Sequence, residues 1–275
     1  MENLIKGFKE NRAFRVTSIL VILLILLTVL APVIAPYNPL ETVMKDANME
    51  PSVAHLFGTD KLGRDVLSRI LYGASYSLTS VLALVAIIFI IGTMLGVLAG
   101  YFGGIVDIVI MRVADMMISF PGVILAIAIA GIMGGSLFNA MVALTCVTWT
   151  KYARLSRSMV LKIKKRDFVD AAIVSGGSAV HILWVHILPN ILPLMVITAA
   201  ADIGAMMMEL AGLSFLGFGS QPPAPEWGLM LNEGRQQLQT APWLMIFPGL
   251  AIFITVVVFN LWGDSLRDVL DPRQD

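Results

Sequence analysis

Long runs of apolar residues limit most strongly what this chain of 275 residues can fold into. A helix satisfies its own backbone hydrogen bonds in lipid, and about 20 apolar residues let it cross the hydrocarbon core. We therefore predict an all-α membrane protein with six spans. The runs cover residues 16–35, 78–100, 108–133, 137–149, 188–213 and 243–262. The fourth run is short for a full crossing.

Composition agrees with a membrane protein and excludes several other classes. Hydrophobic residues make up 57% of the chain and charged residues 14%, against about 45–50% and about 25% in soluble domains. The formal net charge of zero argues against a polybasic nucleic-acid binder. The single cysteine, Cys146, excludes an intrachain disulfide. The chain has no G-x-x-x-x-G-K-[ST] phosphate loop, no H-E-x-x-H and no G-x-S-x-G, so we expect neither an enzyme nor a cofactor in this chain.

The first apolar run could instead be a signal peptide, since basic residues precede it. Its length of about 20 residues exceeds a usual signal core. Pro36 directly follows Ala35, the one plausible cleavage residue. We therefore expect this run to stay as a membrane anchor.

The distribution of basic residues predicts the orientation. With a cytoplasmic N-terminus and six spans, cytoplasmic segments hold fourteen of the nineteen Lys and Arg residues, and external segments hold five. Seven of the fourteen lie in residues 151–166. The positive-inside rule favours this arrangement, with both termini cytoplasmic.

These expectations divide the chain into four parts. The predicted parts are a cytoplasmic tail with the first span (1–36), an external segment (37–72), a transmembrane domain (73–262) and a cytoplasmic tail (263–275). The transmembrane domain contains a cytoplasmic loop at 151–186 and an external loop at 214–242.

The cytoplasmic loop carries the most informative pattern. Asp170 precedes two small residues, Ala171 and Ala172, which would let a short helix be held closely by a groove. Gly176 permits a turn that a side chain would hinder. Pro189 is suited to the first turn of the next span. Taken alone, these residues also fit an ordinary amphipathic loop between spans.

This pattern resembles the EAA loop of ABC-importer permeases, which forms a coupling helix that docks into a cleft of the ATPase subunit. Two departures are visible: Asp170 replaces the usual Glu, and His186 stands where many members have Ile. The string H-I-L-P-N at 186–190 resembles the peptide, opine and nickel branch of the family. The resemblance assigns ATPase coupling to Asp170, Ala171, Ala172, Gly176, His186 and Pro189.

The resemblance covers nearly the whole chain. Further matching strings are G-T-D at 58–60, G-R-D at 63–65, S-F-L-G at 214–217, P-E-W-G at 225–228 and G-D-S-L-R-D at 263–268. It implies a six-helix, type I ABC-importer permease in the bacterial inner (plasma) membrane. It also implies a homologous second permease, two ATPase subunits that bind ATP and Mg, an extracytoplasmic substrate-binding protein and no nucleic-acid partner.

The cargo is a finer inference. M-R-V-A-D-M at 111–116 and E-G-R-Q at 233–236 look most like the second permease of nickel importers. The predicted cargo is therefore nickel, or a nickel or cobalt chelate, and the alternative is a di- or oligopeptide. A passive channel or a proton-coupled carrier is the alternative from another class, and it would need no ATPase-docking loop.

The two external segments are long, polar and structured by Gly and Pro, as a docking platform for a binding protein would be. We assign Glu226 and Arg235 to that docking surface. The alternative is that both segments merely cap the bundle.

Asp202, Met206 and Glu209 share one face of the fifth span, because their spacing is i, i+4, i+7. Carboxylates inside a span normally face a bundle interior or a watery cavity, so this stripe is predicted to line a translocation path and attract a cation. In the alternative, Asp202 is hydrogen-bonded within the bundle, Glu209 lies near the outer water, and the methionine fills space. We expect no tight metal site, because an importer must release its cargo and nickel favours imidazole.

Overall fold

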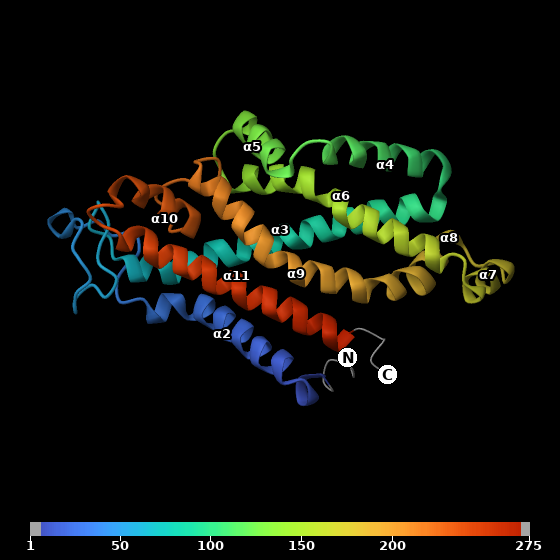
Figure 1. The fold of residues 1–275 in the computed structure, drawn as a ribbon, viewed down its shortest axis with the longest axis horizontal. Helices are drawn as coiled ribbons and strands as arrows, with labels where there is room; N and C mark the ends of the chain where they lie inside the picture. The colour runs from blue at the N-terminus through green and yellow to red at the C-terminus, as the bar shows by residue number, and fades with distance from the viewer. Residues whose placement is uncertain (1–6, 271–275) are drawn as a thin grey trace.

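The computed structural model describes residues 7–270, and in that range the chain is helical with no strand (Figure 1). The long helices are α2 (Arg12–Ile34), α3 (Val66–Phe102), α4 (Gly104–Ile118), α5 (Gly122–Met133), α6 (Leu137–Ile163), α9 (Leu188–Phe215) and α11 (Trp243–Leu270). The short elements are η1 (Met44–Asp46), α7 (Asp167–Val174), α8 (Ala179–His181), the π-helical η2 (Ile182–Ile187), α10 (Trp227–Gly234) and η3 (Arg235–Gln237). The ends of both predicted tails, residues 1–6 and 271–275, lie outside the described residues.

Apart from α5, the long helices run back and forth along the long axis of the molecule (Figure 1). The start of α2 and the end of α11 lie toward the end that carries α7, whereas α10 lies at the opposite end. Within residues 7–270, four helices are long and apolar enough to cross a membrane singly, and α4 with α5 qualifies as a fifth, bent span. The all-α membrane fold predicted from the sequence is confirmed.

The third predicted span is broken rather than continuous. Helix α4 ends at Ile118, α5 begins at Gly122, and the two are bent by 92°. Pro121 lies in the break with an extended backbone. Proline lacks a backbone N–H and disfavours a helical conformation in the residue before it, so the helix ends there.

The boundaries of two predicted loops are also corrected. Helix α6 continues to Ile163 instead of ending near residue 149, so the first part of the predicted loop 151–186 belongs to a helix. Of the six predicted spans, α6 is not among those that qualify by length and apolar composition within residues 7–270. The helix continues because Tyr152, Ala153 and Val160 still face the core, and its basic residues lie on other faces. Helix α3 begins at Val66, inside the predicted external segment 37–72, where Asp65 caps it by accepting a hydrogen bond from the backbone N–H of Ser68 at 2.7 Å.

Helices α3 and α6 are in direct backbone contact. Three glycines of α3, spaced by four residues, face α6: Gly92, Gly96 and Gly100. A Cβ added to Gly96 would lie 2.1 Å from the carbonyl oxygen of Ala153, and one added to Gly92 would lie 2.5 Å from that of Trp149. Small residues at this spacing let two membrane helices approach closely, so any side chain here would push α3 and α6 apart.

Two arginines and two carboxylates form a buried charge cluster at the α10 end: Asp60, Arg64, Arg69 and Glu233. Asp60 Oδ2 accepts hydrogen bonds from Arg64 Nε and Arg69 Nη1, each at 2.6 Å. The carboxylate of Glu233 in α10 accepts from Arg64 Nη2 at 3.2 Å and from Arg69 Nη2 at 2.8 Å. Both arginine side chains are at most 2% exposed. The cluster therefore ties the segment before α3, and the start of α3 itself, to α10.

Candidate functional site

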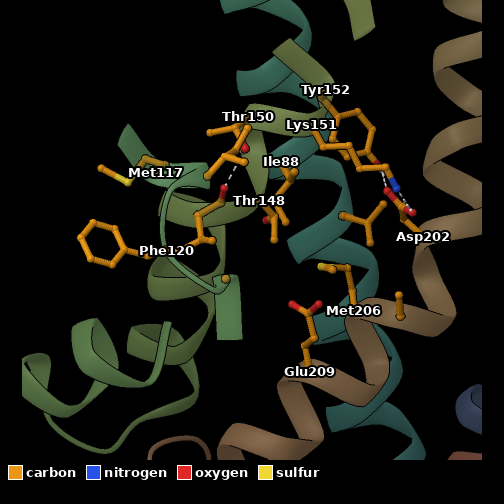
Figure 2. A pocket seen from close by; sticks show the side chains of 15 residues that line it. Ile88, Met117, Phe120, Thr148, Thr150, Lys151, Tyr152, Asp202, Met206 and Glu209 are labelled. Carbon is orange, nitrogen blue, oxygen red and sulfur yellow. Dashed lines mark hydrogen bonds and ion pairs between the residues drawn. The ribbon is translucent and has the colours of Figure 1, made fainter. Parts of the chain in front are cut away.

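A cavity of about 400 Å³ lies among the long helices. We call it the central cavity. Residues of α3, α6 and α9 form much of its wall, and the bend between α4 and α5 contributes Met117, Ile118, Phe120 and Gly122. The three residues of the predicted stripe, Asp202, Met206 and Glu209, all border this cavity (Figure 2). The i, i+4, i+7 spacing in the sequence therefore correctly placed these three residues on one wall of the central cavity.

Asp202 is paired across the helix interface. Its Oδ1 accepts a hydrogen bond from Lys151 Nζ at 2.6 Å, and its Oδ2 accepts one from the Tyr152 hydroxyl at 2.9 Å (Figure 2). The side chain of Asp202 is 13% exposed and that of Lys151 is 59% exposed. Asp202 thus combines both sequence interpretations, since it borders the cavity and is hydrogen-bonded within the bundle.

Lys151 was missed as a site residue because it was assigned to a loop. It lies two residues after the fourth apolar run, so extending that helix by one turn places it and Tyr152 inside α6. Its partner Asp202 lies on another helix, and the spacing within one run carries no information about that contact.

Glu209 is the half-buried acid of the cavity, and its carboxylate points into the open space in Figure 2. Within residues 7–270 it makes no ion pair or side-chain hydrogen bond. Met206 is 7% exposed, so it borders the cavity but mainly packs in the core. No group of three or more His, Cys, Asp and Glu side chains within that range is placed to hold a metal ion.

The predicted coupling residues lie on and around α7 at one end of the molecule. Val169 is buried and anchors α7, whereas Asp170 and Ala171 are exposed and Ala172 is half-buried. Val174 is 87% exposed. Helix α7 therefore presents small, acidic and apolar side chains outward from a single buried anchor.

The residues after α7 shape the return of the chain into α9. Gly176 has a φ of +82°, which favours glycine, and its N–H donates to the carbonyl of Ile173 at 3.0 Å. Pro189 lies in the first turn of α9, as predicted. His186 lies in η2, half-buried, with its ring centroid 6.2 Å from that of Phe168. His186 therefore lies beside Phe168 of α7, whose side chain is itself exposed.

The two predicted docking residues have different environments. Arg235 is exposed in η3, but Glu226 is 2% exposed, so its assignment to a docking surface is wrong. Glu226 caps α10, because its carboxylate accepts hydrogen bonds from the backbone N–H groups of Gly228 and Leu229, each at 2.8 Å. Burial raises the pKa of the Glu226 carboxyl, and these hydrogen bonds oppose that shift.

The string P-E-W-G contained a signal for this role. A carboxylate three positions before a free backbone N–H, at the start of an apolar stretch, is typical of a helix N-cap. The next residue, Trp227, is buried, and its indole N–H donates to the carbonyl of Ile70 at 3.0 Å.

Comparisons with known proteins agree on the kind of chain this is. Residues 92–275 match the family described as binding-protein-dependent transport system inner membrane component. Residues 3–51 match the N-terminal transmembrane domain of oligopeptide transport permease C.

Curated relatives cover most of the chain. A dipeptide transport system permease protein of Alkalihalophilus pseudofirmus is 42% identical over 98% of this chain and 88% of its own length. A nickel transport system permease protein of Escherichia coli K12 is 41% identical over 94% of each chain. A glutathione transport system permease protein of Pectobacterium atrosepticum is 44% identical over 93% of this chain and 85% of its own length.

A solved structure shares the fold. A chain of the MetNI methionine ABC transporter, in an inward-facing conformation, aligns with a TM-score of 0.58 and 20% identity. The alignment covers 74% of this chain and 97% of that one.

Proposed function

This chain belongs to the family of inner-membrane components of binding-protein-dependent transport systems, as an ABC-importer permease of the peptide and nickel branch, and on that premise we propose how it carries out transport. The central cavity is part of the translocation path. Helix α7 receives movement from an ATPase subunit, and a homologous second permease completes the path. The observation that carries this proposal is a cavity bordered by three charged side chains among apolar helices, joined through α6 to an exposed short helix.

Contact with an ATPase is supported by the surface of α7. Phe168, Ile173 and Val174 are 44%, 47% and 87% exposed. A cluster of exposed apolar side chains marks a partner site more often than a solvated surface. ATP and Mg are bound by that partner, and this chain supplies the docked helix.

The proposed orientation puts the α7 end in the cytoplasm and the α10 end outside. The basic residues gather toward the α7 end, as the positive-inside rule requires. In this orientation α10 and the segment before α3 face the binding protein, and exposed Arg235 is the residue we assign to that contact.

For the cargo, we propose a peptide-like solute in preference to free nickel. Lys151 puts a positive charge beside Asp202 in the cavity wall, which weakens the attraction for a bare cation that the acidic stripe alone would provide. The nickel relative keeps a chelated metal as the second candidate.

Coupling is tested by Val174→Asp in the complete transporter, with Val53→Asp as the control. Both valines are more than 80% exposed, at 87% and 97%, so neither change should unfold the permease. Val174→Asp should abolish copurification of the ATPase subunits and uptake of cargo, because it puts a charge in the proposed apolar contact. Val53→Asp should leave ATPase copurification intact. Normal copurification and uptake with Val174→Asp would contradict coupling through α7 and favour a channel or carrier.

A further inference from the structure

The charge distribution in the central cavity has two separate poles. Of the described residues that border it, three are charged: Lys151, Asp202 and Glu209. Lys151 and Asp202 form one pole, where their ion pair leaves the lysine 59% exposed. Glu209 forms the other pole and has no ion-pair partner within residues 7–270.

The first pole has unused hydrogen-bond donors. An ammonium group has three donors, and Asp202 accepts from Lys151 at one of its oxygens. Because Tyr152 donates to the other oxygen at 2.9 Å, Asp202 is held in place and in turn positions the lysine. Lys151 therefore keeps donors free for an anionic group in the cavity.

The distance between the poles suits a short chain molecule. Asp202 and Glu209 are seven positions apart in α9, which corresponds to about 10 Å along the helix axis. An extended peptide advances about 3.5 Å per residue, so two or three residues span a comparable distance. The cavity of about 400 Å³ also lies within the usual range for small-molecule sites.

The wall between the two poles has few polar groups that could select among the side chains of a cargo molecule. Ile88, Val147 and Ala205 are apolar. Thr148 and Thr150 donate their hydroxyl hydrogens to carbonyls of their own helix, at 2.6 and 3.1 Å. Such a wall distinguishes poorly between cargo side chains, so recognition falls to the two charged ends.

We infer that Lys151 and Glu209 form a two-pole site for a zwitterionic peptide, in which Lys151 contacts the cargo carboxylate and Glu209 contacts the cargo ammonium group. This inference rests on the proposed function and specifies it at the level of residues. Asp202 and Tyr152 act as positioning residues for Lys151. A free divalent cation meets an opposing charge at the first pole and a lone carboxylate at the second.

The test measures binding of labelled dialanine to the permease–ATPase complex without the binding protein, whose own selectivity would otherwise dominate. N-acetyl-dialanine, dialanine amide and NiCl₂ serve as competitors. Wild-type protein should bind dialanine and be displaced by unlabelled dialanine at least about tenfold better than by either blocked peptide, because each lacks one charged contact.

Substitutions at Lys151 and Glu209 test which pole binds which end of the peptide. Lys151→Met should weaken dialanine binding about tenfold and remove the discrimination against the amide, whereas Glu209→Gln should remove the discrimination against the N-acetyl peptide. Lys151→Arg keeps the charge and should restore binding. Lys162→Met is the matched control, because it removes the same charge from an exposed position on the same helix outside the cavity.

Two outcomes would overturn the two-pole site. One is wild-type protein that does not bind dialanine, or that NiCl₂ displaces better than dialanine does. The other is unchanged discrimination in Lys151→Met and Glu209→Gln. If Val174→Asp still abolishes uptake in either case, coupling through α7 stands and the two-pole site falls. A preference for NiCl₂ over dialanine would also contradict the proposed peptide-like cargo.

Discussion

Two groups of charged residues in this permease differ in how fully their partners satisfy them. In the buried charge cluster, two arginines face two carboxylates, and each arginine bonds both acids while its side chain stays at most 2% exposed. In the central cavity, one lysine faces one acid from a position that is 59% exposed, and a second acid is left over. In the buried charge cluster the two positive and two negative charges balance, whereas the central cavity holds one more acid than it has cations.

The largest effect that this comparison predicts is on folding. Arg69→Met leaves Asp60 and Glu233 with Arg64 as their remaining cation, and removing one partner from a buried ion pair costs about 3–5 kcal/mol. We expect a strong fall in folded protein, measured as the yield of monodisperse permease and its midpoint of thermal unfolding in detergent. Lys61→Met, at an exposed neighbouring position, is the control and should leave both unchanged. An unchanged midpoint of thermal unfolding in Arg69→Met would contradict a stabilising role for the buried charge cluster, and with it the contrast to the cavity charges.

Glu226 extends the comparison to a buried carboxylate that has no ion-pair partner among the described residues 7–270. Its pKa is raised above the ordinary 4.5 by burial, so the folded protein binds this proton more tightly than the unfolded protein does. The stability it contributes is complete below pH 4.5 and is lost as the pH rises through the folded pKa.

Glu226→Gln removes that pH dependence. The variant also loses part of the cap on α10, at a constant cost of about 1 kcal/mol. The stability of the wild type relative to the variant should therefore fall as the pH is raised from about 4 to about 8. Thermal unfolding of both proteins across this pH range measures this difference in stability. A relative stability that rises with pH would show that the carboxylate is stabilised as an anion.

The smallest expected effect is at the cavity. Lys151→Met should change the free energy of unfolding by less than about 1 kcal/mol, because Lys151 is 59% exposed and water screens its ion pair with Asp202, which also keeps its hydrogen bond from Tyr152. The same unfolding measurement applies, with Arg69→Met as the reference. A loss as large as that of Arg69→Met would mean that the cavity pair is structural, and the contrast between the two groups would disappear.

The sequence predicted the helices better than their ends. An apolar run in lipid has one stable conformation, so the runs located the long helices. The ends depended on tertiary contacts: the basic residues after Trp149 were interpreted as a loop, but Arg157 and Arg154 pair with Asp107 and Asp115 of α4 along the side of a continuing helix.

The candidate site was predictable only where it lay on one helix. Helical periodicity found Asp202 and Glu209, because both belong to α9. It could not find Lys151, because the contact between α6 and α9 joins residues 51 positions apart. The polar segment around Glu226 predicts that this residue lies on the external docking surface. In the structure its carboxylate instead faces inward and accepts hydrogen bonds from the backbone of α10.

The glycine contact between α3 and α6 has a mechanical consequence. The close approach of α3 and α6 along Gly92, Gly96 and Gly100 leaves no room for an added side chain, so we expect the two helices to move together as one rod. Lys151 lies twelve residues before the end of α6 at Ile163, about 18 Å along that rod. If the rod tilts about its α10 end, a push on α7 acts as a lever that swings Lys151 in the same direction by a smaller distance. A displacement of α7 would then also displace Lys151 at the central cavity, although the two lie at different points along the rod.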